Sequence, residues 1–332
     1  MSQAKPNETI GIKGLNIETS NCYSTEHDVL LANCDVIEFL KTVPSETFQL
    51  IVTSPPYNIG KPYEKRQEFV DYLNWQKSII KECVRTLKKG GSLCWEVGNY
   101  IENGEVFPLD VFFYDIIKDQ ADMHLRNRII WTFEHGLHAS KRLSGRYETI
   151  LWFSKGDEYK FNLDNIRVPQ KYPGKTYYKG PNRGKPSANP KGKNPGDIWK
   201  VFYEDWETLV WDIPNVKANH PEKTIHPAQY PIELIERLVV ALTDPGDVVF
   251  DPFMGVGSTL LAASIHGRRA VGVDKEKQYV DISLERLNKL QNGALKYRPL
   301  GTKKYIPSGK EKVARIPEQW MNSNEGNQRI LA

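Results

Sequence analysis

Residues 248–259 place a short apolar strand, a loop with two glycines and the start of a helix in direct succession. Glycines such as Gly255 and Gly257 let a loop backbone adopt positive φ angles and approach a bound group closely. The next apolar run ends at Asp274, about twenty residues past the loop, where an acidic side chain can grip a ribose hydroxyl. A strand–loop–helix–strand unit of this kind predicts a mostly parallel sheet with helices packed on its faces.

The remaining hydrophobic pattern extends this unit into a doubly wound α/β sheet, because strands and helices alternate along most of the chain. Strands are expected at 28–33, 48–53, 92–97, 128–133, 149–153, 247–250 and 270–273. Helices are expected at 36–42, 68–88, 109–117, 231–242, 258–266 and 278–290. Gly90 and Gly91 are expected to stop the 68–88 helix, and the strands at 128–133 and 149–153 to form one antiparallel edge hairpin.

Composition narrows the class of protein. The four cysteines include no C-x-x-C pair, which argues against a disulfide framework or a zinc site and favours the cytoplasm. No apolar stretch reaches the ~18 residues needed to span a bilayer. Residues 160–200 carry a net charge of +8, which leaves −4 for the rest of the chain. This segment predicts an insert that contacts nucleic-acid phosphates, with a solvated flexible loop as the alternative.

A second motif, Ser54-Pro55-Pro56-Tyr57, follows directly on the buried strand at 48–53. Proline fixes the backbone and lacks an N–H group, so the turn leaves carbonyl acceptors free to point one way. Ser54 adds a small polar acceptor and Tyr57 an aromatic face. Together these groups suit a flat heterocycle that carries an exocyclic amino group. The alternative is a proline-rich ligand segment or a plain turn.

The glycine loop by itself is compatible with a nicotinamide dinucleotide or with S-adenosyl-L-methionine. Leu260 stands where a dinucleotide fingerprint has its third glycine or an alanine, which disfavours the dinucleotide. His135 and His138 could suggest a metal, but no nearby cysteine or carboxylate cluster completes a site, so no metal is expected.

Together the two motifs resemble those of the amino-methylating DNA methyltransferases. In that family Ser/Asp/Asn-Pro-Pro-Tyr is catalytic and Phe-x-Gly-x-Gly, here 253–257, binds S-adenosyl-L-methionine. The catalytic motif precedes the cofactor motif and the basic insert lies between them. This order is similar to the β group of restriction-modification methyltransferases, in its Ser-Pro-Pro-Tyr subtype. The resemblance implies a Rossmann-like fold with a permuted motif order and a small inserted DNA-recognition region.

The resemblance also implies roles for individual residues. Four residues are expected to be catalytic: Ser54, Pro55, Pro56 and Tyr57. Nine are expected to bind the cofactor: Asp35, His226, Pro227, Asp251, Phe253, Gly255, Gly257, Thr259 and Asp274. Eight are expected to contact DNA: Lys141, Arg142, Arg146, Lys171, Lys175, Tyr177, Lys179 and Arg183. Asp35 could instead be a simple surface acid, and His226 and Pro227 could merely cap the following helix.

Five segments follow from this assignment. They are an N-terminal tail (1–27), the catalytic half of the methyltransferase domain (28–156), a target-recognition insert (157–220), the cofactor-binding half (221–291) and a C-terminal extension (292–332). The expected partner is double-stranded DNA, with a cognate restriction endonuclease as a functional partner. A monomer or weak dimer near the nucleoid of a bacterial or archaeal cell, or encoded by a phage, is the simplest expectation.

The expected reaction is direct in-line transfer of a methyl group to the amino nitrogen of a flipped base. Serine in the first motif position is similar to the N4-cytosine members, and aspartate to the N6-adenine members. Exceptions leave N6-adenine methylation open. Methylation of RNA or of a protein glutamine is a further alternative, although those enzymes usually place the glycine loop first. A catalytically silent DNA-binding module is the alternative from another class.

Overall fold

The computed structural model describes residues 22–25, 28–61, 64–133, 138–170, 172–199, 215–216 and 220–302. The chain divides into two compact units, Met1–Gly301 and Thr302–Ala332, and every element given below belongs to the first. Several expectations fall outside the described residues. They are Lys171, His135, most of the N-terminal tail, part of the 157–220 insert and the C-terminal extension after Thr302.

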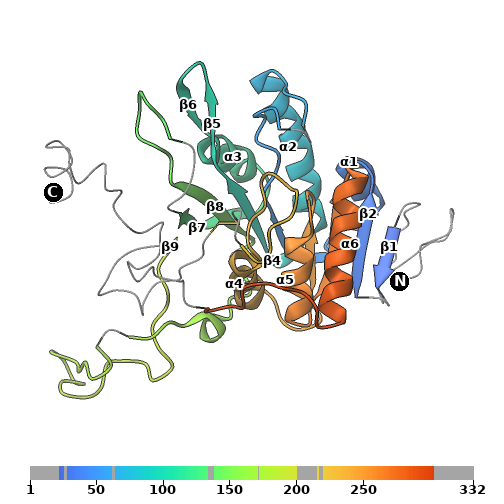
Figure 1. Cartoon of the computed structure of the whole chain (residues 1–332). Coiled ribbons are helices and arrows are strands. Elements are labelled where there is room, and N and C mark those ends of the chain that lie inside the picture. The colour runs from blue at the N-terminus through green and yellow to red at the C-terminus, as the bar shows by residue number, and fades with distance from the viewer. Residues whose placement is uncertain are drawn as a thin grey trace, which may run out of the picture. The chain divides into compact units, whose positions relative to one another are not determined.

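Within the described residues, nine strands form one sheet in the order β1-β2-β11-β10-β3-β4-β8-β7-β9 (Figure 1). The strands are β1 (Cys22–Thr25), β2 (Val29–Asn33), β3 (Phe48–Thr53), β4 (Leu87–Val97), β7 (Met123–Thr132), β8 (Tyr147–Lys155), β9 (Ile198–Trp199), β10 (Val248–Asp251) and β11 (Arg269–Asp274). The five neighbouring strands from β2 to β4 are parallel to one another. Strand β8 pairs antiparallel with both β4 and β7, and β1 pairs antiparallel with β2.

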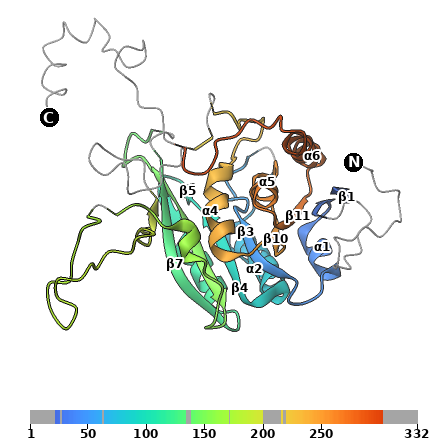
Figure 2. The same ribbon diagram turned by 90° about the horizontal axis from the view of Figure 1, so that it is seen from below.

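Helices cover both faces of the sheet, as Figure 2 shows. The helices α1 (Val36–Thr42), α2 (Phe69–Thr86) and α3 (Leu109–Lys118) pack on one face, and α4 (Ile232–Leu242), α5 (Ser258–Ile265) and α6 (Lys277–Gln291) pack on the other. Successive strand residues alternate between the two cores: Leu50 belongs to one and Ile51 to the other. The predicted doubly wound α/β fold is therefore confirmed.

Helix α2 ends four residues before the predicted stop. The backbone turns extended at Leu87, whose buried side chain starts β4 and pairs with Phe48. Gly90 and Gly91 lie inside β4 at an irregularity of this pairing, with Gly90 at φ 73°. A Cβ on Gly91 would lie 2.9 Å from the Gln49 carbonyl oxygen. These glycines thus serve a strand bulge, and the prediction that they stop the helix was wrong.

Four strands of the described residues were not predicted: β1, β5, β6 and β9. The ribbon β5 (Asn99–Glu102) and β6 (Glu105–Pro108) turns at Asn103-Gly104, both at positive φ, a pair that favours tight hairpins. Strand β1 lies in the segment assigned to the N-terminal tail and extends the sheet beyond β2. At the other side β9 pairs with β7, so the predicted hairpin of β7 and β8 is not the outermost part of the sheet.

Candidate active site

A cavity of about 970 Å³ opens at the carboxyl ends of the parallel strands. β10 and β3 are neighbours, but the chain after β3 runs to helices on one face and the chain after β10 to helices on the other. Loops that diverge in this way leave a crevice, which is where ligands bind in open α/β sheets. Ser54 follows β3 and Phe253 follows β10, so the crevice brings the two sequence motifs together.

The loop that carries the Ser-Pro-Pro-Tyr motif is held by hydrogen bonds on both sides. The Ser54 hydroxyl lies 2.9 Å from the Tyr57 hydroxyl, and the Tyr72 hydroxyl donates to the Pro56 carbonyl oxygen at 2.8 Å. The buried Asn58 side chain donates to and accepts from the backbone of Gln67. All four motif residues line the cavity.

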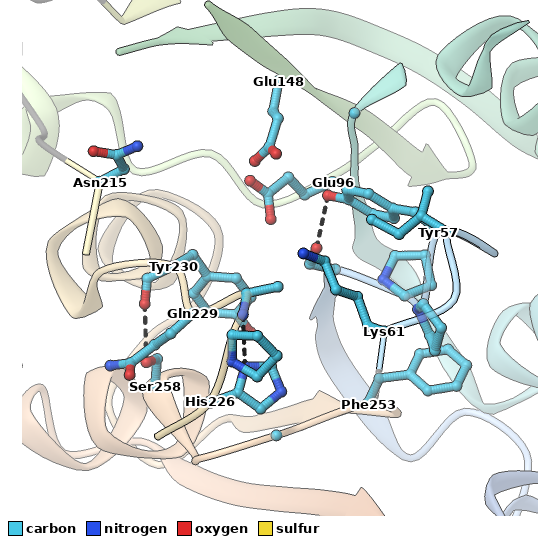
Figure 3. Close-up of a pocket in the computed structure, with 18 of the residues that line it drawn as sticks. Tyr57, Lys61, Glu96, Glu148, Asn215, His226, Gln229, Tyr230, Phe253 and Ser258 are labelled. Atoms are coloured by element: carbon cyan, nitrogen blue, oxygen red, sulfur yellow. Dashed lines mark hydrogen bonds between the residues drawn. The ribbon is translucent and has the colours of Figure 1, made fainter. Parts of the chain in front are cut away.

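Two glutamates lie beside Ser54 that the sequence analysis did not identify. Glu96 on β4 and Glu148 on β8 direct their carboxyl groups toward each other across the cavity wall (Figure 3). Burial and the neighbouring Glu148 carboxyl raise the pKa of Glu96 well above its usual range, and the Ser54 hydroxyl opposes this shift. Two facing carboxyl groups disfavour each other's ionisation, which adds to the effect of burial. The Oε1 atom of Glu96 is buried without a hydrogen-bond partner among the described residues.

One signal for Glu96 was present in the sequence. It is the single charged residue of the buried run 92–97, where a charge needs a partner or a function. Its partner could not be identified in advance, because Glu148 reaches it only through the antiparallel pairing of β4 with β8.

The glycine loop after β10 supports the other side of the cavity. Gly255 and Gly257 have φ angles of 50° and 78°, which other residues rarely adopt. A Cβ on Gly257 would lie 2.9 Å from the Ser283 hydroxyl, whereas one on Gly255 would lie 3.3 Å from His226 Nε2. The loop therefore lies tightly between α6 and the segment that contains His226.

Asp274, at the end of β11, holds this loop through a hydrogen bond to its backbone. One of its carboxyl oxygens accepts from the Gly255 amide at 3.0 Å, and the other accepts from the Glu276 amide at 2.8 Å. Burial raises the pKa of Asp274 to about 7, and the two amide donors oppose that shift. The carboxyl group lines the cavity and so can change charge near neutral pH at the surface that a ligand would contact.

Asp251, Gly257 and Thr259, which were expected to bind the cofactor, are not among the residues that line the cavity. The Asp251 carboxylate is fully buried and accepts from Thr53 at 2.6 Å, Tyr230 at 2.7 Å and Thr259 at 2.6 Å. These bonds join β10, β3, α5 and the segment before α4 behind the cavity wall. Their role is to position the loops that do contact the cavity.

Asp35 and His226 were each predicted with two alternatives. Asp35 lines the cavity and also accepts from the amides of Ile37 and Glu38 as the N-cap of α1. His226 and Pro227 line the cavity as well, and neither caps α4, whose first amide donates to Glu222 at 2.9 Å. Burial lowers the pKa of His226 to about 4, so its ring is neutral at pH 7.

The residues expected to contact DNA divide into two groups. Arg142 and Arg146 line the cavity and Lys141 is exposed in the same loop. The others lie on the exposed segment 172–187 and do not line the cavity: Lys175, Tyr177, Lys179 and Arg183. This segment is closed by backbone hydrogen bonds such as that from the Ser187 amide to the Lys175 carbonyl oxygen at 2.8 Å.

No group of three or more histidine, cysteine or acidic side chains among the described residues could hold a metal ion. No helix in that same part of the chain is long and apolar enough to cross a membrane.

Comparison with known proteins matches this site to one family. A model of the family described as DNA methylase matches residues 48–285. The type II methyltransferase M.BglII of Bacillus subtilis is 46% identical over 267 residues, which cover 80% of this chain and 71% of that protein. The DNA adenine methyltransferase YhdJ of Escherichia coli strain K12 is 33% identical over 263 residues, which cover 76% of this chain and 81% of that protein.

Two solved structures share the fold. The PvuII DNA methyltransferase (cytosine-N4-specific) has a TM-score of 0.58 at 20% identity, covering 81% of this chain and 93% of that one. A DNA modification methylase of Thermus thermophilus, titled as putative and complexed with S-adenosyl-L-methionine, has a TM-score of 0.53 at 28% identity, covering 78% of this chain and 94% of that one. The family match spans both sequence motifs, from the strand before Ser54 to α6.

Proposed function

Since the chain belongs to the family of N6 and N4 amino DNA methylases, we propose that it methylates the exocyclic N4 of cytosine within a specific DNA sequence. It is a DNA methyltransferase of restriction-modification type that uses S-adenosyl-L-methionine. The observation that carries methyl transfer to an amino nitrogen is the meeting, in one cavity, of Ser54 with the Glu96 carboxyl group on one side and Asp274 on the other. The choice of cytosine rests on the serine at position 54. A cognate endonuclease that cleaves the same unmethylated sequence is the functional partner we propose.

The cavity residues fit S-adenosyl-L-methionine. Asp274 is the last residue of β11, the strand that follows the glycine loop, and its carboxyl group could accept hydrogen bonds from the ribose hydroxyls. The Phe253 ring offers an apolar wall for a purine and packs edge-on against Trp75 and Trp95, with centroid distances of 5.8 and 6.4 Å. Asp35, at the mouth of the same pocket, can accept from an amino group. When bound, the cofactor supplies an electrophilic methyl group.

The groups around Ser54 are placed to activate the nucleophile, which is the exocyclic amine of the target base. An exocyclic amine delocalises its lone pair into the ring, so acceptors for its N–H groups must localise and aim that pair. The Ser54 hydroxyl and the buried Oε1 of Glu96 are two such acceptors. The raised pKa of Glu96 makes its carboxyl group a better acceptor for the proton that the amine releases. Tyr57 would stack on the flipped base.

Serine at position 54 supports cytosine N4 as the target, because the family pattern pairs serine with that base. Adenine N6 is the second candidate, since a relative at 33% identity is named as an adenine methyltransferase. Both bases present a ring acceptor beside the exocyclic amine. The reaction steps assigned to Ser54 and Glu96 are therefore the same for either base.

The class of substrate can be tested with purified protein and cofactor labelled in its methyl group. Duplex plasmid DNA, total RNA and a protein extract would be offered in parallel. The proposal expects label in duplex DNA, at a fixed number of methyl groups per plasmid. Label that enters only RNA or protein would overturn it, and no incorporation into any substrate would favour a silent DNA-binding module.

Cofactor affinity is expected to rise with pH. Asp274 has a pKa of about 7, and its ionised form would be the stronger acceptor for the ribose hydroxyls. Binding then favours ionisation and releases protons, so the Kd should fall as the pH increases through 7 and level off above about pH 8.5. Calorimetry between about pH 6 and 8.5 measures this. His226, with a pKa of about 4, stays neutral throughout and contributes no slope.

Asp274→Asn provides the control for that titration. This variant keeps the size of the side chain but cannot ionise, so its affinity should be lower and independent of pH. A wild-type affinity that stays constant or decreases as the pH rises would show that Asp274 does not contact the cofactor in its ionised form.

The salt dependence of DNA binding tests the basic segment 172–187. Neutralising Lys175 and Lys179 to glutamine together should reduce the slope of log K against log salt by about 1.8, because each phosphate contact contributes about 0.9. The matched control neutralises Lys81 and Lys289, which are on α2 and α6. An equal slope for the wild type and the Lys175/Lys179 variant would mean that this segment does not contact phosphates.

A further inference from the structure

The loop 138–146, which leads into β8, carries an unusually exposed apolar side chain. Leu143 is 93% exposed, more than any other large apolar side chain among the described residues. It nevertheless borders the catalytic cavity together with Arg142 and Arg146. Removing a leucine side chain from water lowers the free energy, so the position of Leu143 at the cavity suggests that a ligand covers it.

The loop holds Leu143 outward through its own hydrogen bonds. The Ala139 amide donates to the Ser144 hydroxyl at 3.1 Å, which closes the loop around its tip. The Phe133 amide donates to the Arg146 carbonyl oxygen at 3.0 Å, which ties the end of the loop to the residue that follows β7. The tip is therefore fastened at its base and presents Leu143 away from both cores.

The charges around the tip favour a polyanion over an apolar partner. Lys141 and Arg142, the two residues before Leu143, are exposed, and Arg146 follows three residues later. The Arg146 guanidinium donates to the Gly145 carbonyl oxygen at 2.8 Å and lies 3.4 Å from His138 Nδ1. An apolar side chain with cations on both sides matches a surface where phosphates flank stacked bases.

The tip of the loop, at Leu143, is also only a few residues in sequence from a group beside the reaction site. Glu148, which faces Glu96 beside Ser54, comes only five residues after Leu143. Five residues span at most about 17 Å, so the tip cannot lie far from the place where the target base must enter. When a base leaves the stack for this cavity, the gap that it leaves must lie at the cavity mouth.

We infer that Leu143 inserts into the base stack and fills the gap left by the flipped target base. This inference rests on the proposed function, since it requires a duplex DNA substrate. Leu143 is a positioning residue: it contacts neither the amine nor the methyl group and acts by stabilising the DNA conformation in which the base is extrahelical. The cations of the same loop hold the phosphates on either side.

The test uses the full-length protein and a duplex that contains its target sequence, mapped beforehand in DNA from expressing cells. A second duplex places an abasic site opposite the target base, so that the base is already unpaired. On the paired duplex, Leu143→Ala is expected to lower kcat/KM roughly ten-fold. On the abasic duplex, where the target base is already unpaired, the kcat/KM of the same variant should lie within about two-fold of the wild-type value. Leu143→Met, which keeps the apolar volume, should retain activity on both.

Val70→Ala is the matched control, because Val70 is a 67% exposed apolar residue on α2 that does not line the cavity. Equal losses for Leu143→Ala on the two duplexes, or no loss on either, would overturn the inference. A wild-type protein that methylates neither duplex would instead overturn the proposed function. Activity of the wild type on both duplexes therefore separates the two failures.

Discussion

Ser54→Ala is expected to lower kcat by about 10²–10³-fold and to leave the Kd for S-adenosyl-L-methionine within about two-fold of the wild type. The hydroxyl of Ser54 lies 2.9 Å from that of Tyr57 and borders the cavity beside Glu96, on the side away from Asp274. Removing it takes one acceptor from the amine in the transition state and none from the cofactor. Single-turnover kinetics and calorimetry measure the two quantities separately.

The control for this substitution is Ser78→Ala on α2, where the hydroxyl donates to the Trp75 carbonyl oxygen within its own helix. It should leave both kcat and cofactor affinity unchanged. If Ser54→Ala weakened cofactor binding as much as it slowed turnover, the two halves of the cavity would be wrongly assigned. Full activity of the variant would remove Ser54 from the reaction.

Glu233→Ala is expected to lower the free energy of unfolding by about 3–5 kcal/mol. Every residue of α4 is buried, and Glu233 in its first turn is only 1% exposed. Its carboxylate accepts from Arg237 at 2.8 Å and from the Gly301 amide at 3.1 Å, and it forms an ion pair with Arg298. Without this carboxylate, two largely buried guanidinium groups would lose the acceptor that they share.

Urea unfolding of the full chain measures this loss. The control is Glu285→Ala on α6, an exposed carboxylate paired with Lys289, for which a change within about 0.5 kcal/mol is expected. A loss below about 1 kcal/mol for Glu233→Ala would show that the segment 292–301 does not hold α4 through this network. The expected stability loss is independent of the catalytic assignment.

The parts of the fold that were predictable are those encoded within a single segment. The apolar run before Ser54 and the alternation around Gly255 each identify a buried strand and the turn that follows it. Local patterns also placed α1 at its observed bounds. The end of α2 was missed, because the tertiary pairing of Leu87 with Phe48 overrides the helical spacing that continues past Thr86.

The site was predictable to the extent that its chemistry lies in contiguous motifs. Ser54, Phe253 and Asp274 were singled out because each lies at or just after the end of a predicted strand, and all three line the cavity. Glu96 and Glu148 were missed because their juxtaposition depends on the antiparallel register between β4 and β8. The support role of Asp251 also needs four separate elements to meet behind the cavity wall, which no local pattern encodes.

The most direct test of the central claim is nucleoside mass spectrometry of DNA from cells that express this protein, with Ser54→Ala as the matched control. N4-methylcytosine is expected in DNA from cells with the wild-type protein and not in DNA from cells with the variant. N6-methyladenine in its place would contradict the assignment of the target base to cytosine. The absence of both modified bases from cells with the wild-type protein would contradict DNA amino-methylation itself.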